Sequence, residues 1–253
     1  MRLFRKTRKA DRVPPSGPPD SRAYAIGDIH GRLDLLDGLL AQIAADRSAR
    51  PCARDFIVFL GDLIDRGPES RGVLQRLQQL GSMRTNTVFL MGNHEEMLLR
   101  VLGPEPENVF DWLRYGGDAF ARSYGVAESS LDAHDAATVA DAVRAAVPDE
   151  DLAFVASFAD TFRFGDYLFV HAGIRPGVAL EEQKIADLRW IRKEFLSNSV
   201  QHHLFVIHGH TISDGPDERP NRTGIDTGAY SSGILTAICL EGTDRRYFAT
   251  APV

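Results

Sequence analysis

The sequence of 253 residues is poor in cysteine and contains no long hydrophobic run. Only Cys52 and Cys239 are present, without paired spacing, which excludes a small domain held together by disulfides. Since no stretch of about 18 apolar residues occurs, we expect no membrane-spanning helix and no stable membrane association. The basic N-terminus is not followed by an apolar stretch, so it does not resemble a secretory signal, and the cytoplasm is the simplest location.

An excess of positive charge is also absent. The formal net charge is −6, from 29 Lys and Arg against 35 Asp and Glu. This balance argues against a general nucleic-acid binder, which needs a basic surface, and we expect no nucleic-acid partner. Residues 1–20 differ from the rest, because they are basic and rich in proline. We therefore predict a disordered, solvated tail over 1–20 and a single domain over 21–253.

From residue 22 on, short apolar strands alternate with segments of helical spacing, which favours an α/β fold with parallel strands. The expected strands cover residues 22–27, 56–60, 87–91, 161–164, 167–171, 204–208, 224–227 and 234–240. The expected helices cover residues 33–46, 69–80, 94–102 and 186–196. Residues 103–158 interrupt this alternation with helical spacing alone, which predicts a helical cap over one edge of the core.

Acids, histidines and one asparagine follow five of the expected strands at the point where each strand ends. They are Asp28, His30, Asp62, Asn93, His171 and His210. Ligands of open α/β sheets lie beyond the carboxyl ends of the strands, so these side chains should converge on one crevice. Burying so many carboxylates and imidazoles together is costly unless cations accompany them. Their mixed oxygen and nitrogen donors suit Mn²⁺, Fe or Zn²⁺ better than Ca²⁺.

The motifs Gly27-Asp28-Ile29-His30-Gly31, Gly61-Asp62-Leu63-Ile64-Asp65-Arg66-Gly67 and Gly92-Asn93-His94-Glu95 occur in this order. With His171-Ala172-Gly173 and Gly209-His210-Thr211, they resemble the calcineurin-like metallophosphoesterase superfamily, in particular its compact bacterial and phage-type Ser/Thr phosphatases. The resemblance implies two facing mixed β-sheets flanked by helices. It also implies a phosphoprotein substrate, with in-line attack on the phosphate by a hydroxide that bridges two divalent metals, Mn²⁺ in the first instance.

The resemblance assigns roles residue by residue. Asp28, His30 and the bridging Asp62 would hold the first metal, and Asp62, Asn93, His171 and His210 would hold the second. His94 would be the general acid that protonates the leaving alkoxide, oriented by Asp65. Asn93, Arg66 and a second arginine would bind the substrate phosphate. The pattern Trp190-Ile191-Arg192 favours Arg192 for the second arginine, with Arg189 as the rival.

Two other interpretations remain open at this point. Symmetrical diadenosine tetraphosphate hydrolases belong to the same superfamily, and Val170–Ile174 resembles them. They typically depart from this pattern at the positions of His30 and Asp65, which favours the protein phosphatase. A binding protein with an inactive site would have lost ligands or the acid, whereas this chain keeps all of them.

Overall fold

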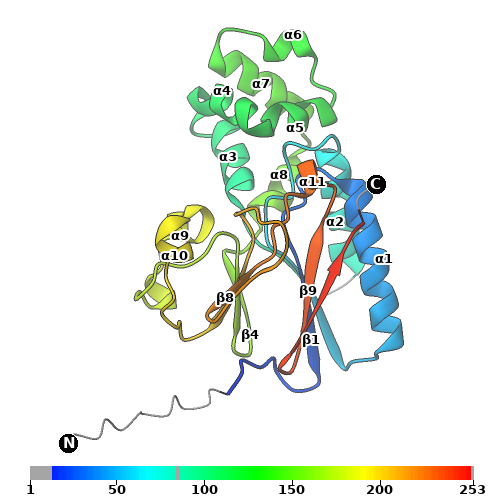
Figure 1. Ribbon diagram of the computed structural model, residues 1–253. Helices are drawn as coiled ribbons and strands as arrows, with labels where there is room; N and C mark the ends of the chain where they lie inside the picture. The colour runs from blue at the N-terminus through cyan, green and yellow to red at the C-terminus, as the bar shows by residue number, and fades with distance from the viewer. Residues whose placement is uncertain (1–12, 84–85, 252–253) are drawn as a thin grey trace, which may run out of the picture.

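The structure is a computed structural model that describes residues 13–83 and 86–251. Two five-stranded sheets face each other, with helices on both outer faces and a helical layer above one end (Figure 1). The expectation of two facing mixed sheets flanked by helices is confirmed. In the described part of the chain, no helix is long and apolar enough to cross a membrane. The location in the cytoplasm stays a prediction.

The first sheet has the strand order β10-β9-β1-β2-β3. Strands β1, β2 and β3 are parallel, while β9 pairs antiparallel with both β1 and β10. The strands are β1 (Ser21–Ile26), β2 (Arg54–Phe59), β3 (Thr87–Phe89), β9 (Thr236–Glu241) and β10 (Asp244–Ala249). The helices that follow the three parallel strands are α1 (Leu33–Ala49), α2 (Ser70–Met83) and α3 (Asn93–Val101).

The second sheet has the order β4-β5-β6-β8-β7, with β5, β6 and β8 parallel. Its strands are β4 (Thr161–Phe164), β5 (Tyr167–Val170), β6 (Phe205–His208), β7 (Asp217–Arg219) and β8 (Arg222–Gly224). A tight hairpin turn at Gly165-Asp166 joins β4 and β5. Smaller helices accompany this half: η3 (Leu180–Glu182), α9 (Ile185–Trp190) and α10 (Lys193–Leu196). The short helix α11 (Ala229–Ser232) follows β8 and packs in the apolar cluster of the first half.

Alternating side chains divide the core into layers, as the two-residue period of a strand requires. In β1, Ala23 and Ala25 face the second sheet, whereas Tyr24 and Ile26 pack under the helices of the first. In β5, Phe169 faces the first sheet, while the side chains of its two neighbours pack against α9 and α10. Both sheets are therefore buried on both faces, and polar side chains concentrate in the loops at the strand ends.

The segment 103–158, which was expected to form a helical cap, contains only helices among its elements of secondary structure. These are η1 (Pro106–Asn108), α4 (Val109–Trp112), η2 (Leu113–Gly117), α5 (Asp118–Ser123), α6 (Glu128–Leu131), α7 (Ala136–Ala146) and α8 (Asp149–Ala156). Figure 1 shows most of them gathered as a cap above the carboxyl ends of the strands. The cap shares the apolar cluster of α1, α2 and α3, so it is continuous with the core.

Four expectations about elements need correction. The expected helix 186–196 is divided into α9 and α10, because Ile191 and Arg192 leave helical geometry. The strand expected at 224–227 lies at 222–224, so Asp226 falls in the loop beyond it. Strands β7 and β10 were not expected, since both are rich in charged residues and carry no apolar alternation.

The predicted tail over 1–20 is also wrong in its second half, whereas residues 1–12 lie outside the described residues. The Gly17 N–H donates to the Gly242 carbonyl in the β9–β10 turn at 2.8 Å. Ser16 exchanges two hydrogen bonds with Asp166 in the β4–β5 turn, and Tyr167 donates to the Pro15 carbonyl. Proline keeps this stretch extended, but backbone hydrogen bonds attach it to both sheets.

Candidate active site

The polar strand ends of both sheets meet in one place beneath the cap. Two groups of side chains have their potential ligand atoms within 4.8 Å of one another: His30, Asp62 and His94, and Asp62, His171 and His210. All of these residues are buried. Asp62 belongs to both groups, as a bridging residue would.

The two carboxylate oxygens of Asp62 face different neighbours. Oδ1 lies 3.4 Å from Nε2 of His171, and Oδ2 lies 3.7 Å from Nε2 of His30. Burial alone would raise the pKa of Asp62, but the surrounding histidines outweigh it and hold the pKa below its usual range. The carboxylate is therefore ionised between two sets of imidazole nitrogens.

Around the second group, four donors point to one small region. Nε2 of His171 lies 3.0 Å from Oδ1 of Asn93 and 3.1 Å from Nδ1 of His210. The opposite nitrogen of His171 is bound to the Leu60 carbonyl at 2.8 Å, which fixes the ring. Nε2 of His210 is buried without a hydrogen-bond partner. Two imidazoles, an amide oxygen and a carboxylate are a donor set that fits a transition metal.

Burial also sets the protonation of these histidines. It lowers the pKa of His30 to about 3 and the pKa of His210 to about 2, and it lowers the pKa of His171 as well. The neutral imidazoles keep the lone pairs that metal ligation requires.

Asp28 lies beside this centre, although it belongs to neither group. Its carboxylate accepts the backbone N–H of His210, at 2.9 Å to Oδ2. Burial and the neighbouring carboxylate of Asp226 raise the pKa of Asp28 well above its usual range. Burial likewise raises the pKa of Asp226 to about 6. Adjacent buried carboxylates are costly by themselves, and a cation would offset that cost.

His94 forms a pair with Asp65 at the start of α3. Its Nδ1 lies 2.6 Å from Oδ2 of Asp65, which is fully buried. Burial opposes the charged imidazole, but the carboxylates of Asp62 and Asp65 prevail and raise the pKa of His94. The Asp65 contact at Nδ1 leaves Nε2 turned toward Oδ2 of Asp62, 3.9 Å away.

Two arginines line the hollow above these groups. The Arg66 guanidinium contacts Nε2 of His30 and Nε2 of His94, each at 3.0 Å. Arg192 enters from the break between α9 and α10 and donates to the His210 carbonyl at 3.0 Å. The rival Arg189 is ion-paired with Asp160 and Glu96 instead. The structure thus brings Arg192 to the site and leaves Arg189 outside it.

The backbone at the site is unusual. His30, Asp62, Asp65, Arg66 and His210 all have positive φ angles, between 46° and 69°. Such conformations cost of order 1–3 kcal/mol each for residues with a side chain, and they persist only where surrounding contacts enforce them. Glycine is the residue favoured in this conformation, but it has no side chain. At each of these five positions the chain instead carries a polar side chain that points into the candidate site.

Sequence reasoning did not identify three residues that shape the site. Glu95 accepts the N–H groups of Asp62, Leu63 and Gly92 and so joins two loops. Tyr230 packs its ring 5.4 Å from that of His30. Trp112, from the cap, donates its indole N–H to Asp65.

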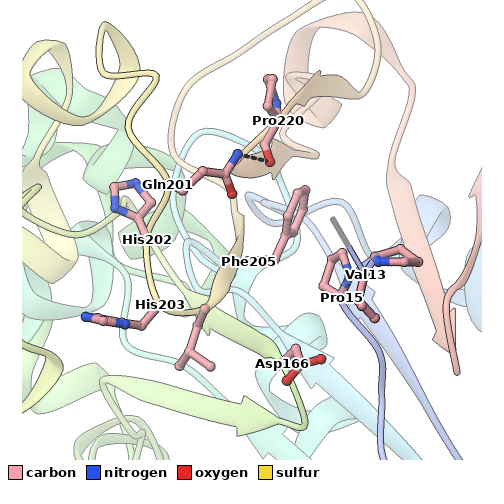
Figure 2. Close-up of a pocket in the computed structure, with 10 residues that line it drawn as sticks. Val13, Pro15, Asp166, Gln201, His202, His203, Phe205 and Pro220 are labelled. Carbon is pink, nitrogen blue, oxygen red and sulfur yellow. Dashed lines mark hydrogen bonds between the residues drawn. The ribbon is translucent and has the colours of Figure 1, made fainter. Parts of the chain in front are cut away.

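A hollow of about 310 Å³ lies over the arginines and is mostly apolar. It is lined by Arg66, Asn93, His94, Met97, Trp112, Tyr115, Trp190, Arg192 and His210. A second hollow of about 320 Å³ lies at the opposite end of the sandwich, between residues 13–15 and the loop before β6 (Figure 2). There, His203 points away from Asp166, and Gln201 is bound to the Pro220 carbonyl. No metal-like cluster forms among the residues described at that end.

A cysteine-based phosphatase site does not form in the described part of the chain. Cys239 and Arg245 are separated by five residues, the spacing of such a site, but they lie in the β9–β10 hairpin. Cys239 is paired with Arg246 across the hairpin, whereas Arg245 stacks over Phe205 on the other face. Burial raises the pKa of the Cys239 thiol to about 11, so it is not a thiolate.

Comparison with known proteins agrees with this geometry. The family model of the calcineurin-like phosphoesterases matches residues 21–226. Serine/threonine-protein phosphatase 1 of Salmonella typhimurium is 30% identical over 84% of this chain and 89% of its own length. The symmetrical bis(5'-nucleosyl)-tetraphosphatase of Cellvibrio japonicus is 28% identical over 86% of this chain and 95% of its own.

Shorter matches are more similar but less complete. The symmetrical tetraphosphatase of Pseudomonas fluorescens is 36% identical over 108 residues, and the match spans only 35% of that protein. Among solved structures, one assigned provisionally to the diadenosine tetraphosphatases superposes with a TM-score of 0.64. It covers 94% of this chain and 97% of its own at 19% identity, which supports the fold alone. The chain belongs to the calcineurin-like phosphoesterase family.

Proposed function

We propose that this metallophosphoesterase is a two-metal phosphomonoesterase that hydrolyses phosphoserine and phosphothreonine in proteins. The observation that carries the proposal is the buried Asp65–His94 pair, with a separation of 2.6 Å. A serine or threonine alkoxide is a poor leaving group, so a positioned acid should accelerate its departure by about 10²–10⁴-fold. A nucleotide leaving group is already a weak base and needs that proton far less.

The metal ligands proposed are those that the strand ends bring together. Asp28, His30 and Asp62 would hold one divalent ion, and Asp62, Asn93, His171 and His210 would hold the other. When bound, two such ions would supply a nucleophilic hydroxide at neutral pH and neutralise charge on the phosphoryl oxygens. Mn²⁺ is the first choice, and Fe or Zn²⁺ also suits these donors.

The other residues act on the substrate. Arg66 and Arg192 lie on the rim of the hollow and would each hold phosphate oxygens, since a planar guanidinium matches two of them. The amide of Asn93 would contact the phosphate beside them. His94 would donate a proton from Nε2 to the leaving oxygen, while Asp65 holds Nδ1.

Symmetrical dinucleoside tetraphosphate hydrolysis is the second candidate. It is favoured by the names of several relatives and by the exposed aromatic rings of Tyr115 and Trp190 beside the hollow, which could pack on a base. Those hydrolases typically lack the residues that correspond to His30 and Asp65, and this chain has both.

The experiment compares two substrates on the Mn²⁺-loaded enzyme. We expect kcat/KM for a phosphoserine peptide to exceed that for diadenosine tetraphosphate, and the opposite order would select the second candidate. His94→Ala should retain both metals and lose about 10²–10⁴-fold with the phosphopeptide. It should lose much less with 4-nitrophenyl phosphate, whose leaving group needs little protonation. An equal loss on both substrates would reject the general-acid role.

A further inference from the structure

The cap touches the Asp65–Arg66 turn with a single buried side chain. Trp112, at the end of α4, is 1% exposed and donates its indole N–H to Oδ2 of Asp65 at 3.1 Å. The same oxygen accepts from Nδ1 of His94 at 2.6 Å. A residue of the cap and the proposed general acid therefore share one carboxylate oxygen.

The cap backbone holds the next residue of the same turn. Arg66 donates its backbone N–H to the Gly116 carbonyl at 3.0 Å. Gly116 has a φ of 111°, and a Cβ there would lie 2.6 Å from the Arg66 nitrogen. Since Asp65 and Arg66 both have strained positive φ angles, the cap supports this turn at two points.

The carboxylate of Asp65 has few other restraints. Its second oxygen, Oδ1, is buried and has no hydrogen-bond partner among the described residues. Without the indole N–H, only His94 would fix the rotation of the carboxylate about its last bond. Packing alone does not explain the contact, because a ring that merely filled space beside Phe120 would need no donor aimed at this oxygen.

We propose that Trp112 is a positioning residue for the reaction, whose indole N–H fixes the Asp65 carboxylate in the orientation that aims His94 at the leaving group. This inference rests on the proposed function, in which His94 is the general acid. The cap then does more than shape access to the site, because it completes the hydrogen-bonded chain from Trp112 through Asp65 to His94.

The test removes the donor and measures leaving-group dependence in the full chain loaded with Mn²⁺. Trp112→Phe should lower kcat for a phosphoserine peptide by about tenfold and kcat for 4-nitrophenyl phosphate by less than about twofold. Metal content should not change. Because phenylalanine also leaves a void, a second variant carries benzothienylalanine at position 112, which keeps the ring shape and replaces the N–H with sulfur. It should show the same selective loss.

Phe120→Leu is the matched control, because Phe120 packs on the Trp112 ring and is fully buried in the cap. It should lower Tm while leaving the ratio of the two substrates unchanged. In a His94→Ala background, Trp112→Phe should produce no further selective loss, since the acid through which it acts is gone.

Failure of the inference and failure of the proposed function are distinguishable. If His94→Ala is selective but both Trp112 variants reduce the two substrates equally, or reduce neither, the positioning role is overturned alone. A selective loss that persists in the His94→Ala background also overturns it, because Trp112 would then act by another route. If His94→Ala itself is unselective, the general-acid role fails, and the inference fails with it.

Discussion

The two ends of the sandwich carry hollows of nearly equal volume, about 310 Å³ under the cap and about 320 Å³ beside residues 13–15. The hollow under the cap adjoins buried carboxylates, buried imidazoles and five residues with positive φ. The opposite hollow (Figure 2) is lined mostly by exposed or half-exposed side chains, and none of its lining residues has a positive φ. Volume therefore does not distinguish the candidate site from the opposite hollow. Buried charged and polar side chains and backbone strain do distinguish it, because a protein retains these costly features only where surrounding contacts enforce them.

The largest effect should come from the carboxylate of Asp62, with the carboxylate of Asp166 at the opposite end for comparison. Asp62→Asn removes the charge between the two groups of histidines, so we expect loss of both metals and a fall in kcat of roughly 10³-fold or more. Metal analysis of the purified variant measures the stoichiometry. Asp166→Asn is the matched change in the opposite hollow and should leave both quantities unchanged. Full metal content in Asp62→Asn would contradict the bridging role.

The next largest effect should be on KM, and it should differ between Arg192 and Arg189, two arginines of the same segment. Arg192→Ala should raise KM for phosphopeptide by roughly 10- to 100-fold, the contribution of a hydrogen bond to a charged group. Arg189→Ala should leave KM within about twofold and lower Tm slightly, because it loses only its ion pairs with Asp160 and Glu96. Steady-state kinetics measures KM for both variants. A larger KM for Arg189→Ala than for Arg192→Ala would show that Arg189, and not Arg192, binds the phosphate.

The smallest effect should arise at the opposite end and should concern stability alone. A Cβ at Gly17 would lie 2.5 Å from a ring carbon of Phe164, so Gly17→Ala should cost about 1–3 kcal/mol through overpacking. That corresponds to a loss of several degrees in Tm. Gly215→Ala, where a Cβ would meet nothing within 4 Å, is the control. A change in kcat for Gly17→Ala would show that the two ends are coupled.

The sequence predicted the arrangement at the end under the cap far better than the arrangement at the end beside residues 13–15. Five strand ends with polar residues predicted that these side chains come together at one candidate site, because parallel strands bring their carboxyl ends to one edge. The indole N–H of Trp112 could not be predicted, because it depends on how the cap folds back over the Asp65–Arg66 turn. The break at Arg192 was equally hidden, since its sequence has an ordinary helical spacing.

Strands β7 and β10 and the attachment of residues 13–20 were missed for another reason. Edge strands carry charged residues, and extended proline-rich segments pair through backbone groups, so neither leaves an apolar pattern in the sequence. Conversely, α1 was predictable, because Leu35, Leu36, Leu39, Leu40 and Ile43 form one buried face. The periodicity of apolar residues predicts which side chains are buried, but it does not predict hydrogen bonds that the main chain makes.

The attachment of residues 15–17 has a practical consequence. These residues bridge the β9–β10 turn of one sheet and the β4–β5 turn of the other. The family match begins at residue 21, so a truncation at that boundary would sever the bridge. Because the loops of the candidate site come from both sheets, anyone trimming the gene for expression should retain the prolines, or expect the sandwich to loosen at its base.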